Sequence, residues 1–219
     1  MDKAFANRCN CIVSSHDSDA SASFPRYTPR AMPKYVDYEG RRRALADAVC
    51  ELAAERGAEA VTLRDVATRA GVSMGAVQRA FRTRDDMLVF ALEQVGERVM
   101  TRVRTQGNRS ARRPARSQLA TLANELALLD EARRAEAAVW LAFVAQATFT
   151  PRLAKVLRVN YGEILRALAA LLGGDREEAC ALLALVDGLT LHVLVGQLTP
   201  GAAKRILDAR LARHEAADG

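Results

Sequence analysis

Aromatic residues are scarce in this sequence, and β-branched residues form no run that reads convincingly as a strand. Phe, Tyr and Trp make up 5% of the 219 residues, whereas Ala and Leu are abundant. Strands favour aromatic and β-branched side chains, and almost every apolar pattern here repeats with a period near 3.6 instead of 2. These absences argue against a β-rich fold. The pattern predicts an all-α protein with one large or two small domains.

Cysteine is equally rare, and its four positions fit no known framework. Cys9 and Cys11 lie in a polar region, while Cys50 and Cys180 lie in predicted helices. This spacing gives neither a disulfide scaffold nor a four-ligand zinc site. Cys9 and Cys11 near His16 would need a fourth ligand and fixed geometry to hold a metal. We therefore interpret the region as an ordinary flexible tail and expect no metal and no cofactor.

Patterns that indicate catalysis are missing too. The chain has no Ser-His-Asp pattern, metal-ligand spacing or phosphate-binding loop. Asp187 and His192 are the only ionisable residues in a long apolar stretch, but five positions along a helix turn them about 140° apart. They are a poor acid-base pair, and we predict that the protein is not an enzyme. A satisfied polar pair in the core is the alternative to ligand contact, and for His192 we prefer it.

The N-terminal region lacks the continuous apolar run that a signal peptide requires. Residues 1–37 are rich in Ser, Asp, Asn and Pro, and we expect a disordered extension because little apolar surface is available to offset chain entropy. Met32 is a natural alternative start, which would make residues 1–31 an upstream extension. Lys34 instead could belong to a basic arm that touches DNA. We expect a cytoplasmic protein.

The sequence does contain a compact set of helix signals between Thr62 and Arg84. Thr62 and Asp65 can cap a first helix. Gly71 stands where that helix would end in the left-handed conformation, and Ser73 opens a second helix. Two short helices joined by such a turn form the helix-turn-helix that reads DNA. The net charge of +6 agrees with an anionic partner, although many basic proteins share it.

This stretch resembles the N-terminal signature of the TetR-type bacterial transcriptional repressors. The matching residues are Thr62, Val66, Ala67, Ala70, Gly71, Val72, Ser73, Gly75, Phe81, Arg84 and Leu88. Farther along, Asp187-Gly188-Leu189 in an apolar helix is similar to the branch with a BetI-like regulatory domain. The chain has Gln78 where the family usually has Tyr, and Ala80 where a second aromatic is common. The resemblance implies a pendulum motion of a long linking helix, which changes the separation of two DNA-binding heads.

Residues in and around the second short helix are the candidates for DNA contact. Gln can pair with adenine and Arg with guanine, so Gln78 and Arg79 are the candidates for reading bases. Basic residues just beyond a reading helix contact phosphates more often than not. The predicted DNA-binding set is Arg41, Arg42, Arg43, Thr62, Ser73, Met74, Gly75, Ala76, Gln78, Arg79, Arg82 and Arg84.

The arginine triplet at residues 41–43 has two interpretations. It can be a solvated helix start, or it can contact phosphates beside the operator. We favour phosphate contact, because the helix dipole disfavours cations at a helix N-terminus and such a triplet needs compensation.

Helical periodicity and breaks divide the rest of the chain. We predict helices at residues 38–56, 84–106, 117–130, 131–149, 150–173 and 175–198, a break at 107–110, and a last helix from Thr199. The domain organisation predicted is a helix-turn-helix DNA-binding head at 38–84, a helical ligand-binding and dimerisation domain at 85–214, and a tail at 215–219. The arginine-rich residues 102–116 could bind an anionic ligand or nucleic acid. We favour a solvated loop, because no aromatic residue is interleaved with them.

Aromatic side chains gather in one predicted helix of the second domain. Trp140, Phe143 and Val144 share a stripe at helical spacing, which is usually core. The family resemblance makes such residues candidates to line a cavity among the helices. The predicted ligand-binding residues are Trp140, Phe143, Val144, Phe149, Tyr161 and Asp187. An apolar lining with one carboxylate favours a largely hydrophobic, cationic compound.

The predicted helix at 175–198 is apolar on nearly every side. Its length approaches that of a membrane span, but Asp187 near its middle would cost ~3 kcal/mol there. We therefore predict that one face is buried in the domain and the other against a second subunit. With the last helix it would form a four-helix dimer interface containing Leu191, Leu194, Val195, Leu207 and Leu211.

Together these patterns predict a ligand-responsive transcriptional regulator. It would be a repressor that binds a pseudo-palindromic double-stranded DNA operator as a homodimer, and an unknown small-molecule effector would release it. The alternative is a constitutive DNA-binding or architectural protein without a ligand. A large enclosed cavity would favour the first function over the second.

Overall fold

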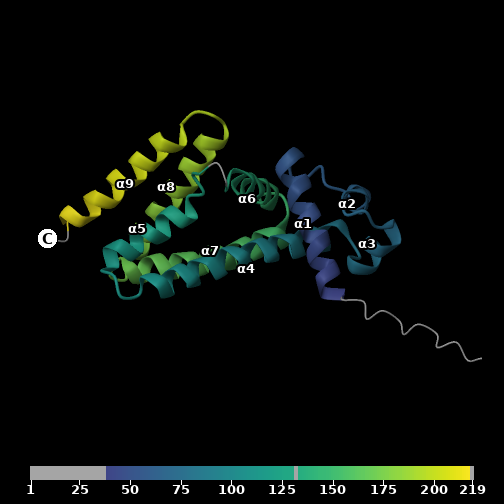
Figure 1. The fold of residues 1–219 in the computed structure, drawn as a ribbon, viewed down its shortest axis with the longest axis horizontal. Helices are drawn as coiled ribbons and strands as arrows, with labels where there is room; N and C mark the ends of the chain where they lie inside the picture. The colour runs from purple at the N-terminus through teal and green to yellow at the C-terminus, as the bar shows by residue number, and fades with distance from the viewer. Residues whose placement is uncertain (1–37, 131–132, 218–219) are drawn as a thin grey trace, which may run out of the picture. The chain divides into compact units, whose positions relative to one another are not determined.

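The computed structural model describes residues 38–130 and 133–217, and these residues form helices and connecting turns without a strand (Figure 1). The helices are α1 (Tyr38–Arg56), α2 (Leu63–Arg69), α3 (Met74–Ala80), α4 (Arg84–Ser110), α5 (Ala115–Leu126), α6 (Arg134–Ala147), α7 (Pro151–Leu171), α8 (Arg176–Leu194) and α9 (Pro200–Ala217). The all-α prediction is confirmed. The predicted extension at 1–37, with Lys34 and the cysteine pair near His16, lies outside the described residues.

The predicted break at residues 107–110 is wrong, because α4 continues through Ser110. Ser110 is buried at the end of this helix, and its hydroxyl donates to the Gln106 carbonyl at 2.7 Å. Gly107 inside a helix costs about 1 kcal/mol relative to Ala. Burial of Met100 and Val103 against α5 and α7 offsets that cost.

Buried side chains in the described residues form two hydrophobic clusters. The first contains residues of α1, α2, α3 and the first half of α4, and α6 and the start of α7 pack against them. The second joins the rest of α4 and α7 to α5, α8 and α9. Figure 1 shows α4 and α7 side by side, and both helices contribute to both clusters. Helix α4 therefore links the packing around the helix-turn-helix to the packing of the C-terminal helices.

Candidate DNA interface and ligand cavity

Local capping fixes both helices of the helix-turn-helix. The Asp65 amide donates to the Thr62 hydroxyl at 3.2 Å, and the Thr62 amide donates back to the Asp65 carboxylate at 3.2 Å. The Ala76 amide donates to the Ser73 hydroxyl at the start of α3. Gly71 between the helices has φ +64°, a conformation that residues with a Cβ rarely adopt. These signals act between residues close in sequence, and the two short helices and the turn that they predict are confirmed.

One face of α3 is left open to solvent. Gln78 and Arg79 are exposed, and so is Met74 at the start of the helix. Val77 and Phe81 lie in the core, as the sequence predicts. The exposed face therefore presents an amide and a guanidinium, the two groups that pair best with adenine and guanine edges.

The other predicted residues of this interface differ in exposure. Ser73, Thr62 and Arg82 are exposed, whereas Gly75 and Ala76 are half-buried within α3. Gly75 has no side chain and Ala76 has only a methyl group, so the α3 backbone can come close to a partner surface.

The three arginines at the start of α1 differ in exposure and in their contacts. Arg41 and Arg43 are exposed, but the Arg42 guanidinium carbon lies 4.0 Å from the centre of the Phe90 ring and 5.3 Å from that of Phe81. A cation over aromatic faces is attracted by the ring quadrupole. Arg42 therefore holds α1 against the start of α4, and we leave it out of the phosphate-contact set.

Arg84 is also occupied within the protein. Its guanidinium donates to the carbonyl oxygens of Val61, Ala58 and Glu59 at 2.8, 2.7 and 2.6 Å. The three bonds tie the beginning of α4 to the segment that leads into α2. Because these donors already have partners, Arg84 positions the helix-turn-helix instead of serving as a free phosphate clamp.

Tyr38 is a functional candidate that the sequence reasoning missed. Its hydroxyl donates to the Arg79 carbonyl near the end of α3 at 3.2 Å. The last carbonyls of a helix have no partner within the helix, so this bond fixes the α3 terminus. An aromatic residue at a predicted helix start carries no signal for a contact 41 positions away.

Three of the predicted ligand residues come together at a small cavity among α4, α5, α6, α7 and α8. Trp140 and Tyr161 meet edge to face with ring centres 5.5 Å apart, and the Tyr161 hydroxyl donates to the Asp187 carboxylate at 2.9 Å. All three side chains line the cavity, whose volume is about 30 Å³. Ligand pockets usually measure roughly 300–1,000 Å³, so the cavity is closed to a drug-sized molecule in this conformation.

Burial dominates the electrostatics of the Tyr161–Asp187 pair. It raises the pKa of the Asp187 carboxyl above its ordinary value, and the Tyr161 hydrogen bond offsets part of that rise. Burial also raises the pKa of Tyr161, and the nearby Asp187 charge raises it further. A buried carboxylate gains most from a partner that brings positive charge.

The remaining ligand predictions fall away from this cavity. Phe143 is fully buried in the cluster that contains the helix-turn-helix core, and Val144 packs on the same cluster. Phe149 is 85% exposed at the α6–α7 turn and therefore cannot form the wall of an enclosed site. The stripe spacing identified a buried helix face, but it could not show which neighbouring helices that face contacts.

An ion-pair network at the cavity was not predicted. Arg102 of α4 donates to Glu125 of α5 at 2.9 Å and also to Glu136 of α6. Glu125 in turn pairs with Arg133 at 3.1 Å. Arg102 and Glu125 both line the cavity. The interpretation of residues 102–116 as a solvated loop is therefore wrong for Arg102, because its acidic partners are far away in sequence.

The predicted dimer residues also divide by burial. Leu207 and Leu211 face the core of their own chain and are buried, so they cannot form an intersubunit surface in this fold. Leu194 is half-buried in a groove beside α1 and α6. Leu191 and Val195 are 40% and 65% exposed, and Ile206 on the apolar side of α9 is 41% exposed. These three are the large apolar side chains that are exposed on the described part of α8, its C-cap and α9.

No group of three His, Cys, Asp or Glu side chains in residues 38–130 and 133–217 is arranged to hold an ion. Over the same residues, no helix combines the length and apolar character that crossing a bilayer requires.

A helix-turn-helix joined by one long helix to a second group of helices defines a helical DNA-binding regulator. The model for bacterial regulatory proteins of the tetR family matches residues 45–89, and the model for the C-terminal part of BetI-type transcriptional repressors matches residues 114–215. The transcriptional regulator PksA of Bacillus subtilis is 34% identical over 173 residues, which cover 75% of this chain and 83% of PksA. The chain belongs to the TetR family of transcriptional regulators.

Solved structures agree with this assignment. A transcriptional regulator from Rhodococcus sp. Rha1 has a TM-score of 0.74 at 36% identity, over 80% of this chain and 96% of the other. The multidrug binding protein EbrR, solved with imidazole, has a TM-score of 0.59 at 28% identity, over 78% of this chain and 94% of its own.

Proposed function

We propose that this regulator is a repressor that binds a pseudo-palindromic operator as a homodimer and is released by a small molecule. The observation that carries the proposal is the open face of α3, where the side chains of Gln78 and Arg79 are exposed. Tyr38 bonds the end of this helix, Arg42 holds α1 against α4, and Arg84 ties α4 to the segment before α2. A rigid reading helix with free base-pairing side chains suits the major groove.

Contacts to DNA divide by chemistry in this proposal. Gln78 and Arg79 read base edges, with Met74, Gly75 and Ala76 allowing close approach of α3 to the groove. Arg41, Arg43 and Arg82 are exposed cations beside α3 and bind phosphates. Thr62 and Ser73 lie at the N-termini of α2 and α3, where backbone amides and hydroxyls also suit phosphate oxygens.

Homodimerisation in this proposal uses the exposed apolar side chains of α8 and α9. Leu191, Val195 and Ile206 have apolar surface that a second copy can remove from water. Two such helices per subunit make a four-helix interface. The interface would hold the two heads at a fixed spacing, as an operator with two half-sites requires.

The proposed effector site is the Trp140–Tyr161–Asp187 cavity. A hydrophobic cation suits it, because two aromatic rings attract cations and Asp187 supplies the opposite charge. EbrR, at 28% identity, is described as a multidrug binding protein and was solved with imidazole, which supports ligand binding as a property of this fold. The cavity must widen to admit a ligand, so the ligand would select a conformer different from the closed one.

The alternative remains a constitutive DNA-binding protein, and the small volume of the cavity is the observation that favours it. Sequencing of DNA fragments selected by the purified protein tests the proposal. We expect enrichment of an inverted repeat with half-sites one helical turn apart or a multiple of it. Selection without an enriched sequence would instead indicate an architectural protein.

A further inference from the structure

The proposed effector cavity contains a positive charge of its own. The guanidinium of Arg102 lines it together with two acids, Glu125 and Asp187, and no other charged residue of the described chain does so. Like charges repel each other strongly where little water screens them. A cationic ligand beside Trp140 therefore requires that the Arg102 guanidinium move away.

Arg102 has one acidic partner at the cavity and a second outside it. Its Nε donates to Glu125 of α5 at 2.9 Å, and its Nη2 donates to Glu136 of α6. Glu136 does not line the cavity, and its side chain is more exposed than that of Glu125. Arg102 can therefore leave Glu125 and keep a carboxylate partner, so that the movement does not create an unpaired buried charge.

Glu125 also keeps a partner when Arg102 leaves. The Nη1 of Arg133 lies 3.1 Å from the same Glu125 oxygen, Oε1, and donates to the Glu125 carbonyl oxygen at 3.1 Å. A carboxylate accepts several hydrogen bonds, and those from charged donors are the strongest. The place next to Glu125 that Arg102 would leave therefore suits the positive group of a ligand.

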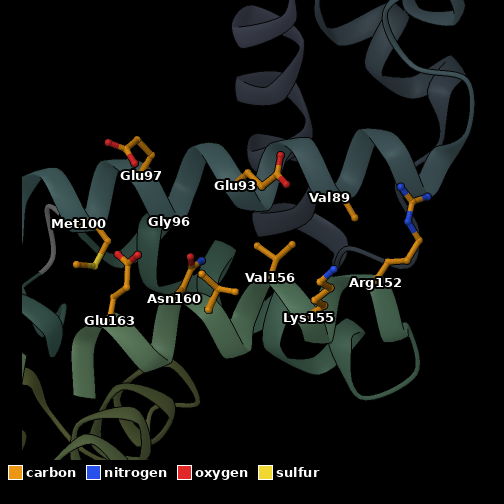
Figure 2. Close-up of a pocket in the computed structure, with 11 residues that line it drawn as sticks. Val89, Glu93, Gly96, Glu97, Met100, Arg152, Lys155, Val156, Asn160 and Glu163 are labelled. Carbon is orange, nitrogen blue, oxygen red and sulfur yellow. The ribbon is translucent and has the colours of Figure 1, made fainter. Parts of the chain in front are cut away.

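Arg102 lies on the helix that leads to the helix-turn-helix, beyond a close contact with α7. Figure 2 shows Gly96 of α4 opposite Asn160 of α7, and the Asn160 amide leaves no room there for a Cβ. Arg102 follows this contact by six residues, about 9 Å along the helix, and Asp86 at the start of α4 precedes it by ten. A displacement of α4 at Arg102 would therefore turn the helix about Gly96 and move the end next to the helix-turn-helix.

We infer that Arg102 is the residue that a cationic ligand displaces. The positive group of the ligand takes the place of the guanidinium at Glu125, Arg102 keeps Glu136, and the cavity gains the volume that the guanidinium occupied. The closed cavity of about 30 Å³ is then the ligand-free arrangement. This role rests on the proposed effector cavity, and it adds the residue that closes the cavity and links it to α4.

Titration of the full-length protein with benzyltrimethylammonium, followed by Trp140 fluorescence, tests the inference. Neopentylbenzene, which has the same shape without the charge, is the matched probe. Arg102→Met removes the guanidinium and keeps an unbranched side chain. The variant gains room for both probes, but its gain in affinity should be about tenfold larger for the cation, the change that one charge-assisted hydrogen bond produces.

Glu125→Gln breaks the same ion pair and should have the opposite effect. It removes the acid and leaves Arg102 in place, so the cation should bind about tenfold more weakly relative to neopentylbenzene. A purely structural role of the pair would change both variants in the same direction. Arg104→Met is the control, because it removes an exposed guanidinium of α4 whose partner, Glu97, lies on the same helix. This control should leave both affinities unchanged.

A conservative variant and operator release complete the test. Arg102→Lys keeps the charge and should bind the cation within about twofold of the wild type, so a folded control exists if Arg102→Met is unstable. The benzyltrimethylammonium concentration that releases operator should fall in Arg102→Met in proportion to the gain in affinity.

Two outcomes separate this role from the proposed function. The inference is overturned, and the effector cavity stands, if the wild type binds the cation but Arg102→Met and Glu125→Gln shift its affinity in the same direction or leave it unchanged relative to neopentylbenzene. Trp140 fluorescence that neither probe changes, in the wild type and in Arg102→Met alike, would contradict the cavity itself and the role of Arg102 with it.

Discussion

Arg79 carries the sharpest expectation at the scale of single residues. It is exposed on α3, and the Tyr38 bond to its own carbonyl fixes the backbone from which its side chain extends. Arg79→Ala should reduce discrimination between operator and random DNA by ~1–3 kcal/mol, because a bidentate base contact is lost. Competition binding at one salt concentration measures this difference.

Arg82→Ala is the matched control for this variant. It removes an equally exposed cation next to α3 and should weaken operator and random DNA alike, with a smaller salt dependence. If Arg79→Ala weakens both DNAs to the same extent, Arg79 is a phosphate contact and does not read bases.

Asp187 gives the molecule a pH dependence with a defined sign. Burial raises its pKa above the ordinary 3.8, so the folded chain retains a proton that the unfolded chain releases. Asp187 therefore contributes its full stabilisation when the pH is below its ordinary pKa. This stabilisation is lost as the pH rises through the higher pKa of the folded state. Asp187→Asn removes the titrating carboxyl group and keeps an oxygen that can accept a hydrogen bond from the Tyr161 hydroxyl.

Urea unfolding of the wild type and Asp187→Asn between about pH 4 and 8 checks this sign. We expect the unfolding free energy of the wild type, relative to the variant, to fall as the pH rises. A difference that stays constant over this range would mean that the carboxyl is as well solvated in the folded protein as in the unfolded chain.

At the scale of helices, capping is the feature on which α2 depends. The helix has seven residues, too few to be stable alone, and its Thr62–Asp65 capping box satisfies donors that would otherwise be free. Thr62→Ala should destabilise the protein by about 1 kcal/mol in urea unfolding. Thr68→Ala, within the same helix, replaces Thr by a better helix former and should be neutral or slightly stabilising. Equal stability of the wild type and Thr62→Ala would contradict this assignment.

The elements also show what the sequence can and cannot predict. Thr62, Ser73 and Gly71 act on neighbours within a few residues, so α2, α3 and their turn followed from local patterns. The end of α4 and the burial of Leu207 depend on helices far away in sequence. Helical periodicity identifies an apolar face but gives no information about its partner, which is why Phe143 and Leu211 were assigned to the wrong surfaces.

At the candidate site, too, the sequence does not show which distant residues a charged side chain contacts. Trp140, Tyr161 and Asp187 were predicted together because aromatic and buried ionisable residues are conspicuous in an apolar sequence. Arg102 and Glu125 were missed because each is an ordinary charged residue of a helix surface until α4 and α5 pack together. Only the fold brings the two into contact.

At the scale of the whole molecule, the homodimer depends on a small exposed apolar surface. Val195→Arg should shift the protein from dimer toward monomer in sedimentation velocity, because it places a charge in the proposed interface. Val159→Arg is the control, since Val159 is similarly exposed but lies on α7. A dimer that is unaffected by Val195→Arg would place the interface elsewhere.

Coupling between ligand and DNA is the central claim for the whole molecule. Trp140 is the only tryptophan in the sequence and contacts Tyr161 at the cavity, so its fluorescence reports directly on a bound compound. A panel of lipophilic cations and neutral aromatics identifies the compound that changes this fluorescence most. Because linkage is reciprocal, a ligand that lowers operator affinity must itself bind more weakly when operator is present.

The most direct measurement is the affinity of that compound, by Trp140 fluorescence, with and without saturating operator. We expect operator to lower the protein's affinity for the compound by the same factor by which the compound lowers its affinity for operator. An affinity that operator leaves unchanged, or a panel in which no compound alters Trp140 fluorescence or releases operator, would contradict ligand control and favour constitutive DNA binding.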